Sequence, residues 1–228
     1  MMRRTARILG GVLAVLGFLA LAWTVTVWRW QDPFTALYTH YEQGKLARSL
    51  ERQFESYRPP SRQLASRGDS ANEVAAAAAR YRRAAHVGQA IGRIAVPRLG
   101  LNMVVVNGTD EATLRKGPGR YLGSGMPGEG RLVYIAGHRT TYLAPFSHIE
   151  ELRKGDRVTL ATPYATFVYR ITGYRIVRAN DLSVLRSHGH ESLELQACHP
   201  RFFATHRYIA YALPVRVVPR RGHAYAVR

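Results

Sequence analysis

The sequence holds a single cysteine, Cys198, in 228 residues. One cysteine excludes a disulfide within the chain and any metal site built from several thiolates. Acidic side chains are also scarce, because 15 Asp and Glu stand against 33 Lys and Arg and give a net charge of +18. Such a balance favours an anionic partner, either nucleic acid or an anionic membrane or cell-envelope surface. No nucleic-acid-binding motif accompanies the charge, and the sequence has no internal repeat.

A run of uncharged, mostly apolar residues occupies positions 8–28. A helix of that length covers about 30 Å, the thickness of the hydrocarbon core of a bilayer. Three arginines precede the run and only Arg29 closely follows it, so the positive-inside rule places the N-terminus in the cytoplasm. We therefore expect residues 1–30 to be a single-pass anchor in the cell membrane, with an extracellular domain. That location removes nucleic acid as a partner and leaves the membrane, an anionic wall, or a merely solubilising surface charge.

A cleaved signal peptide is the alternative interpretation of this N-terminus. Ala20, Leu21 and Ala22 form the small-residue pattern at which signal peptides are cut. The apolar run continues beyond this pattern to residue 28, which favours an anchor that stays attached.

Residues 31–86 are expected to form a helical stalk and a linker. Apolar and aromatic side chains keep helical spacing over residues 33–57, which predicts an amphipathic helix. The Pro-, Ser- and Arg-containing residues 58–69 have the composition of a linker. The pattern Ser-x-x-Glu at residues 70–73 is a capping box, so we expect a second, alanine-rich helix over residues 71–85.

From residue 87 onward, short β-branched or aromatic segments alternate with Gly, Pro, Asn and Asp. This pattern is typical of an all-β barrel or sandwich. The segments predicted to be strands are residues 93–96, 103–107, 131–136, 157–160, 166–172, 174–177, 193–198, 207–213 and 215–218. We assign residues 87–219 to this domain and expect the basic tail, residues 220–228, to be disordered.

The cysteine lies in a predicted hairpin, residues 192–211, whose first strand alternates apolar and more polar side chains. Pro200 ends that strand, because proline has no N–H to give to a ladder. Antiparallel pairing with the second strand would bring Cys198 beside Arg207. A guanidinium favours the thiolate and can bind the oxyanion formed when a thiolate attacks a carbonyl. The alternative is a cysteine that only packs and an arginine that is a surface charge.

A thiol nucleophile needs a proton donor for its leaving group, and histidine is the usual choice. His138 follows a predicted strand in a Gly-His turn, at a strand end where loops build sites. His199 is adjacent to Cys198, so in a regular strand the two side chains would point to opposite faces. The loop histidines that could form a chance metal site instead are His188, His190 and His206.

The segments IAGHRTTY…APF at residues 135–146 and LQACHP at residues 195–200 precede Arg207 in the chain. Together they resemble the sortases, the membrane-anchored cysteine transpeptidases of Gram-positive cell envelopes. The segment LRKGPGRY at residues 114–121 resembles the class E sortases of actinobacteria. The resemblance covers residues 94–218 and implies an eight-stranded β-barrel with the site at one end of a groove.

The resemblance implies a role for each of five residues. Cys198 matches the nucleophile, His138 the general acid/base, and Arg207 the clamp for the oxyanion or the substrate. Ala136 matches a position on the groove floor. Tyr121 matches a tyrosine associated in class E with preference for LAXTG over LPXTG sorting signals. We expect no metal or other cofactor, because the few acidic residues near the groove do not match the calcium site of some class A members.

The sequence departs from the family pattern near these residues. The family's TLxTC reads ELQAC here, so Glu194 and Ala197 stand in place of both threonines. The resemblance implies that the threonine before the cysteine positions the signal or the oxyanion, and Ala197 has no hydroxyl with which to do so. Leu143 stands where class E sortases often have glycine. The departures leave the cysteine, histidine and arginine of the pattern unchanged.

The mechanism that the resemblance implies is acyl transfer. Cys198 would attack the Thr–Gly carbonyl of a sorting signal, and His138 would protonate the departing amine. The expected partners are secreted proteins with a C-terminal sorting signal and an amine on lipid II or a peptidoglycan cross-bridge. Two alternatives stay open: a hydrolytic cysteine peptidase with water as acceptor, and an inactive anchored β-domain that binds envelope polymers through its charge.

Overall fold

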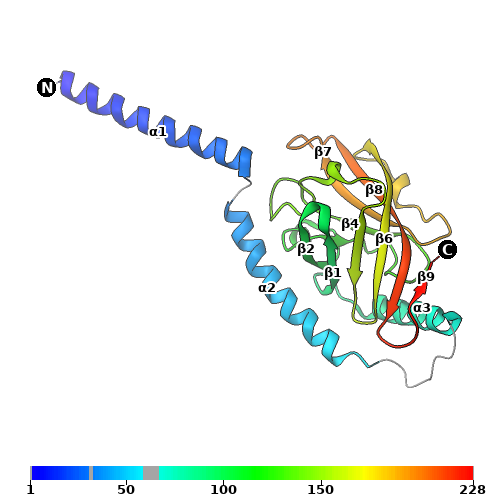
Figure 1. The fold of residues 1–228 in the computed structure, drawn as a ribbon. Coiled ribbons are helices and arrows are strands. Elements are labelled where there is room, and N and C mark those ends of the chain that lie inside the picture. The colour runs from blue at the N-terminus through cyan, green and yellow to red at the C-terminus, as the bar shows by residue number, and fades with distance from the viewer. Residues whose placement is uncertain (1, 31–32, 59–66, 228) are drawn as a thin grey trace.

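The structure is a computed structural model that describes residues 2–30, 33–58 and 67–227. Figure 1 shows a long N-terminal helix that stands away from a β-barrel and a second helix that runs along the barrel. A third helix lies at the end of the barrel that is at the bottom of the view. The helices are α1 (Met2–Trp30), α2 (Pro33–Ser56), α3 (Arg67–Ala84), the one-turn α4 (Glu111–Leu114) and the 3-10 turns η1 (Pro97–Leu99), η2 (Ile149–Glu151) and η3 (Leu182–Leu185).

Eight strands of the described chain close into a barrel in the order β6-β5-β1-β2-β3-β4-β7-β8, with β8 pairing back onto β6. The β2–β3 and β4–β7 pairs are parallel, and the other pairs are antiparallel. The closed ring confirms the all-β, eight-stranded barrel and excludes the sandwich. The strands are β1 (Ala90–Val96), β2 (Leu101–Asn107), β3 (Gly119–Arg120), β4 (Val133–Ala136), β5 (Arg157–Ala161), β6 (Ala165–Arg178), β7 (Leu193–His199), β8 (His206–Pro219) and β9 (Tyr225–Ala226).

The two longest strands were each expected as two shorter ones. Gly173 and Pro214 suggested turns, but β6 and β8 run through these residues as continuous strands. The pairing shifts register beside each of them. The residue left out of the pairing is in each case the neighbour of the expected breaker, Thr172 beside Gly173 and Val215 beside Pro214. Such a bulge bends the strand and lets it continue. The prediction of breaks at these two positions is therefore wrong.

The barrel interior is filled by apolar side chains from every long strand. Ile94, Phe167 and Leu195 have no exposed surface, and they belong to one continuous core cluster. The first strand of the hairpin was expected to be half-buried. In the structure Leu193, Leu195 and Ala197 have no exposed surface, whereas Gln196 and Cys198 on the other face are partly exposed, so the alternation is confirmed. Glu194 is the exception on that face, because it is fully buried.

Helix α2 packs against the barrel along β1 and β2. Leu46 and Leu50 form a small core with Ala90, Val104 and Val106. Burying a leucine side chain stabilises the folded state by roughly 1.5–3 kcal/mol, so this contact holds the helix against the domain. The sequence predicted the helix but not this docking, and the stalk is thus part of the barrel's surface. Residues 59–66 of the predicted linker lie outside the described residues.

Helix α3 closes one end of the barrel, where Val74, Ala77 and Ala78 join the main core. It begins at Arg67, three residues before Ser70, so the predicted capping box is wrong. Ser70 is buried inside the helix, and its hydroxyl accepts a hydrogen bond from the His223 backbone N–H at 3.1 Å.

The C-terminal tail is ordered in the described structure, contrary to the expected disorder. β9 pairs with β8 through Arg216 and Val217. Tyr225 and Val227 pack on the main core. Two alternating apolar side chains and a free edge of β8 thus suffice to add a short strand. β9 lies near α3 in Figure 1.

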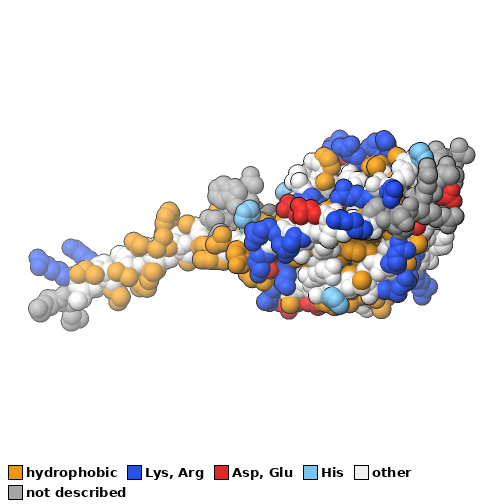
Figure 2. Space-filling model, turned by 90° about the horizontal axis from the view of Figure 1, so that it is seen from below, with side chains coloured by type: hydrophobic (Ala, Val, Ile, Leu, Met, Phe, Trp, Pro, Cys, Tyr) orange, Lys and Arg blue, Asp and Glu red, His pale blue; other side chains and the backbone are white. Residues whose placement is uncertain are grey.

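Helix α1 holds the one segment of the described chain that is long and apolar enough to cross a membrane, Arg3–Val25, with a mean hydropathy of 2.3. No part of it is buried in the structure. Figure 2 shows hydrophobic side chains along the length of this helix and basic side chains at its N-terminal end. Its length and composition are compatible with a single-pass anchor.

Candidate active site

The site lies where β4 and β7 end together and β8 begins. The two parallel strands pair Ala136 with Gln196, and the Gly137 N–H donates to the Gln196 carbonyl at 3.0 Å. The residues that follow both strands therefore meet at one edge of the barrel. Antiparallel pairing of β7 with β8 then places Cys198 directly opposite Arg207, as the hairpin pattern predicted.

A cavity of about 410 Å³ opens at this edge. The structure brings all five predicted site residues to its walls. The lining residues are Thr109, Leu114, Tyr121, Tyr134, Ala136, Gly137, His138, Ala179, Leu185, Gln196, Cys198 and Arg207.

Cys198 is partly exposed, and its neighbour Arg207 is held by the hairpin loop. Nη1 of the Arg207 guanidinium donates to the carbonyls of Ala204 at 2.7 Å and His206 at 2.9 Å. Among the described residues both bonds use Nη1, so Nε and Nη2 can serve a ligand. A planar guanidinium fixed in this way can present paired N–H donors to an oxyanion.

His138 is half-buried, and its Nε2 atom has no hydrogen-bond partner among the described residues. Burial lowers the pKa of its imidazole below the ordinary value of 6.5, and the nearby positive charge of Arg115 lowers it further, partly offset by Glu111. At neutral pH the imidazole is therefore mostly uncharged and able to accept a proton.

His199 points away from this site, as the strand alternation predicted. Its Nδ1 atom lies 3.0 Å from Nη1 of Arg139, and the same Nη1 donates to the Cys198 carbonyl at 3.0 Å. Nη2 of Arg139 pairs with Glu150 at 2.7 Å. Arg139 is 5% exposed, and it ties the end of β7 to the η2 turn. Sequence reasoning missed this residue, although it directly follows the histidine of the motif.

Tyr121 is fixed on the cavity wall by its backbone. Its N–H donates to the Tyr134 carbonyl at 2.9 Å, and its own carbonyl accepts from the Ser124 hydroxyl at 2.7 Å. The two tyrosine rings meet edge to face at 6.4 Å. The hydroxyl of Tyr134 in turn donates to Gln196 Oε1 at 2.6 Å. Tyr134 and Gln196 are site residues that the sequence did not single out.

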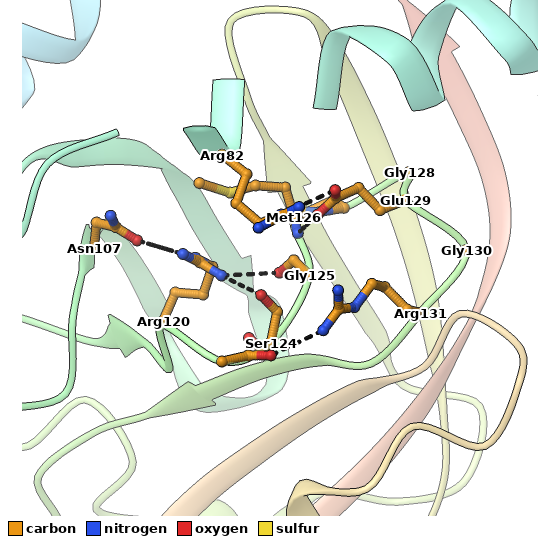
Figure 3. A network of polar contacts seen from close by, with 12 residues as sticks. Arg82, Asn107, Arg120, Ser124, Gly125, Met126, Gly128, Glu129, Gly130 and Arg131 are labelled. Carbon is orange, nitrogen blue, oxygen red and sulfur yellow. Dashed lines mark hydrogen bonds and ion pairs between the residues drawn. The ribbon is translucent and has the colours of Figure 1, made fainter. Parts of the chain in front are cut away.

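Arg120, the residue before Tyr121, anchors this segment from inside the barrel (Figure 3). Its guanidinium is buried and donates to Asn107 Oδ1 at 2.8 and 3.0 Å and to the carbonyls of Ser124 and Gly125. Burial without a directly bonded carboxylate lowers the pKa of Arg120 to about 10. The network links β2 and β3 to the loop behind Tyr121, so it sets where that tyrosine lies.

Glu194 is fully buried, and neither of its carboxylate oxygens has a partner among the described residues. It lies four residues before Cys198 in β7, at the position where the sequence already departs from the family pattern. Burial raises the pKa of its carboxyl from 4.5 to about 7. The neutral acid is favoured in the fold because no cation bonds to the charged form.

We expect Glu194→Gln to remove a pH-dependent loss of stability. The pKa is higher in the folded state, so the stability present below about pH 4.5 is lost as the pH rises through about 7. The free energy of unfolding of the glutamine variant, relative to that of the wild type, should therefore be larger at pH 8 than at pH 5 by up to about 3 kcal/mol. Urea unfolding at both pH values measures this, with the exposed Glu55→Gln as control. An equal gain at both pH values would contradict the assignment.

The site thus combines the groups that thiol-based acyl transfer requires. Cys198 offers a nucleophile, the imidazole of His138 can carry a proton, and Arg207 can stabilise an oxyanion. No group of three or more His, Cys, Asp or Glu side chains that could hold a metal occurs in the part of the chain that the structure describes.

Comparison with known proteins places the chain in a family. The family model described as "Sortase domain" matches residues 94–215, which is more than half of the chain. The chain therefore belongs to the sortase family.

Individual relatives agree with this assignment. Sortase D of Bacillus subtilis (strain 168) is 37% identical over 128 residues, which cover 54% of this chain and 63% of that protein. The match thus spans less than two thirds of the relative's length. The Sortase D5 transpeptidase of Clostridium perfringens shares the fold with a TM-score of 0.62, at 22% identity over 77% of this chain and 99% of that one. Sortase E from Streptomyces avermitilis gives a TM-score of 0.53 at 31% identity over 59% and 93%.

Proposed function

We propose that this chain is a membrane-anchored cysteine transpeptidase. It cleaves a sorting signal of the LAXTG or LPXTG type between Thr and Gly and transfers the acyl group to a cell-wall precursor amine. The observation that carries the proposal is the pairing of Cys198 with Arg207 in a cavity that also holds His138. Membership of the sortase family supports the same chemistry.

In the proposed reaction, Cys198 gives its proton to His138 and its sulfur attacks the threonine carbonyl carbon of the signal. Arg207 donates N–H groups to the oxygen, which becomes an oxyanion as the S–C bond forms. The C–N bond then breaks, and His138 returns the proton to the departing glycine amine. An acceptor amine attacks the thioester, loses its proton to His138, and displaces the sulfur. The acyl group leaves joined to the new amine.

The proposed acceptor and cellular location depend on α1 being a membrane span. A span over Arg3–Val25 would hold the domain outside the membrane, with the N-terminus in the cytoplasm. Secreted proteins that carry a sorting signal, and an amine on lipid II or peptidoglycan, would then be confined near the same surface. Such confinement raises their effective concentration for the enzyme.

The reaction is tested by incubating the full chain in detergent with LAXTG and LPXTG peptides, with and without an added glycine-based amine. Mass spectrometry should find the N-terminal peptide fragment joined to the amine through threonine. Release of the free acid at the same rate with and without the amine would instead identify a hydrolytic peptidase. Absence of cleavage of both peptides, while Cys198 still reacts with thiol probes, would favour an inactive binding domain.

Tyr121 is proposed to set the preference for alanine at the second signal position, as in class E sortases. Its place on the cavity wall supports contact with the signal. We expect Tyr121→Ala to reduce the ratio of LAXTG to LPXTG cleavage rates more than it reduces the faster rate. Competition between the two peptides measures the ratio, and Tyr121→Phe, which keeps the ring, is the control. An unchanged ratio in the alanine variant would remove Tyr121 from specificity.

His138→Ala should lose most of the peptide-cleavage activity, whereas His199→Ala should keep much of it. Removing a general acid/base typically costs about 100- to 10,000-fold in rate. His199 faces Arg139 instead of the cavity, so its loss affects only packing at the end of β7. Steady-state cleavage rates of both variants decide the point. A larger loss at His199 would mean that it, and not His138, carries the proton.

A further inference from the structure

We propose that Tyr142 is a positioning residue for His138, and that Thr35 at the beginning of α2 holds Tyr142 in place. The helix that connects the barrel to α1 would then be a working part of the active site. This inference rests on the proposed function, in which His138 carries the proton.

The first observation is the contact between the two rings. The centroids of His138 and Tyr142 lie 4.9 Å apart, with the ring planes inclined by 43°. Nε2 of His138 has no hydrogen-bond partner among the described residues. Active-site bases are usually oriented by a third group, and here ring packing against Tyr142 provides that orientation.

The second observation is the backbone of the segment that carries Tyr142. Three successive residues other than glycine have positive φ: Tyr142 at 55°, Leu143 at 60° and Ala144 at 36°. The left-handed region is unfavourable for residues other than glycine, so the segment keeps this shape only where its surroundings hold it. One contact that holds the segment comes from Phe146, whose N–H donates a hydrogen bond to the His138 carbonyl at 3.2 Å.

The third observation is that α2 makes further contacts that hold the Tyr142 segment. The backbone N–H of Tyr142 donates to the hydroxyl of Thr35 at 3.1 Å, across 107 positions of sequence. The ring of Tyr38, one turn further along α2, meets the Tyr142 ring edge to face at 6.5 Å. Both contacts come from the same side of the helix, because residues three apart lie on one face.

The same face of α2 also fixes Arg115, whose guanidinium lies 5.8 Å from the centroid of the Tyr142 ring. The Thr39 hydroxyl donates to the Arg115 carbonyl at 2.7 Å. Gln43, one turn later, exchanges hydrogen bonds with the Val104 N–H and carbonyl and donates to the Lys116 carbonyl. Thr35, Thr39 and Gln43 thus form a polar stripe that reaches the active-site loops, ahead of the apolar Leu46 and Leu50.

This arrangement also controls the charge around the imidazole. The titratable and charged groups near His138 are Tyr142 from its own loop, Arg115 and Glu111 from α4 and its end, and Cys198 and Arg207 from β7 and β8. Burial and Arg115 both lower the pKa of His138. Loosening the Tyr142 segment would expose the imidazole of His138 to water, so the pKa of His138 should rise toward its ordinary value.

The test uses the full chain in detergent, with Thr35→Val, Thr35→Ser and Tyr142→Ala as variants. Thr35→Val keeps the shape of the side chain but removes the acceptor, and we expect kcat/KM to fall about fivefold, the equivalent of one hydrogen bond. Serine restores the hydroxyl and should restore the rate. Tyr142→Ala should fall further, mainly in kcat, and the acidic limb of its kcat/KM profile should move to higher pH. Thr172→Val, an exposed threonine in β6, is the matched control.

A readout that needs no substrate separates this inference from the proposed function. Modification of His138 by diethyl pyrocarbonate, located by mass spectrometry, should be faster in Thr35→Val and Tyr142→Ala than in the wild type. Faster modification in a chain that cleaves no signal peptide would overturn the proposed function and keep the coupling. Wild-type modification rates, or a wild-type rate and pH profile in Thr35→Val, would overturn the coupling.

Discussion

Replacing Cys198 by alanine is expected to abolish cleavage of sorting-signal peptides and formation of a thioacyl adduct. The sulfur is the nucleophile of the proposed reaction, and alanine offers nothing in its place. The fold should survive, because the side chain is partly exposed and its removal leaves no buried cavity. We therefore predict loss of activity to background with a melting temperature close to that of the wild type.

The matched comparison is Cys198→Ser, which keeps a weak nucleophile of similar size. Both variants should bind the signal peptide with near wild-type affinity, since peptide contacts along the cavity are preserved. Turnover by the alanine variant at more than a trace of the wild-type rate would disprove the assignment. A collapse of the melting temperature would show that the cysteine has the packing role described above as the alternative.

Arg207→Lys is expected to lower the cleavage rate by about a hundredfold to a thousandfold, the typical cost of removing one preorganised oxyanion donor. The loop carbonyls of Ala204 and His206 hold one end of the guanidinium, which aims its remaining donors. A lysine ammonium keeps the charge but cannot reproduce the planar fork. Arg207→Ala should fall at least as far.

Alkylation of Cys198 by iodoacetamide distinguishes the possible roles of this arginine, because the reagent needs a thiolate but no oxyanion donor. We expect both Arg207 variants to be alkylated at near wild-type rates. Near-normal cleavage by the lysine variant would reduce Arg207 to a point charge. Loss of alkylation in step with cleavage would show that it sets the ionisation of the thiol instead.

Local patterns were sufficient to predict a barrel or sandwich and the pairing of Cys198 with Arg207. The eight-stranded barrel and the places of Tyr121 and Ala136 in the site followed from family resemblance. Alternation along β7, the stop at Pro200 and the aromatic strand after it placed Cys198 opposite Arg207. These features depend on neighbours in the sequence, and register follows from a short hairpin. The position of His138 in the same cavity followed from family resemblance, because β4 and β7 are parallel strands that no short connection relates.

The parts that could not be predicted depend on contacts between distant residues. Gly173 and Pro214 are breakers by local rules, yet pairing over the length of β6 and β8 carries the strands through them. Glu194 has the pattern of an exposed strand position, yet it is fully buried, with Tyr134 and Tyr211 as its partners in the two neighbouring strands. The Thr35 contact with Tyr142 spans 107 positions, and no periodicity in either segment reveals it.

The docked helices also bear on how the domain should be handled. A fragment that begins at residue 87, where the β pattern starts, would lack Leu46 and Leu50 of α2 as well as Val74 of α3. It would expose apolar surface on β1 and β2 and lose the support of the Tyr142 segment. Assays on the full chain avoid both effects.

The central claim is that Cys198 carries the acyl group between the signal and the acceptor. The most direct measurement is the intact mass of the full chain, quenched in acid shortly after mixing with an LAXTG peptide in the absence of an amine. We predict a mass increase equal to the N-terminal peptide fragment, located on Cys198 by fragmentation and removed by hydroxylamine. An unmodified Cys198 while the peptide is being cleaved, or an adduct on another residue, would contradict the account.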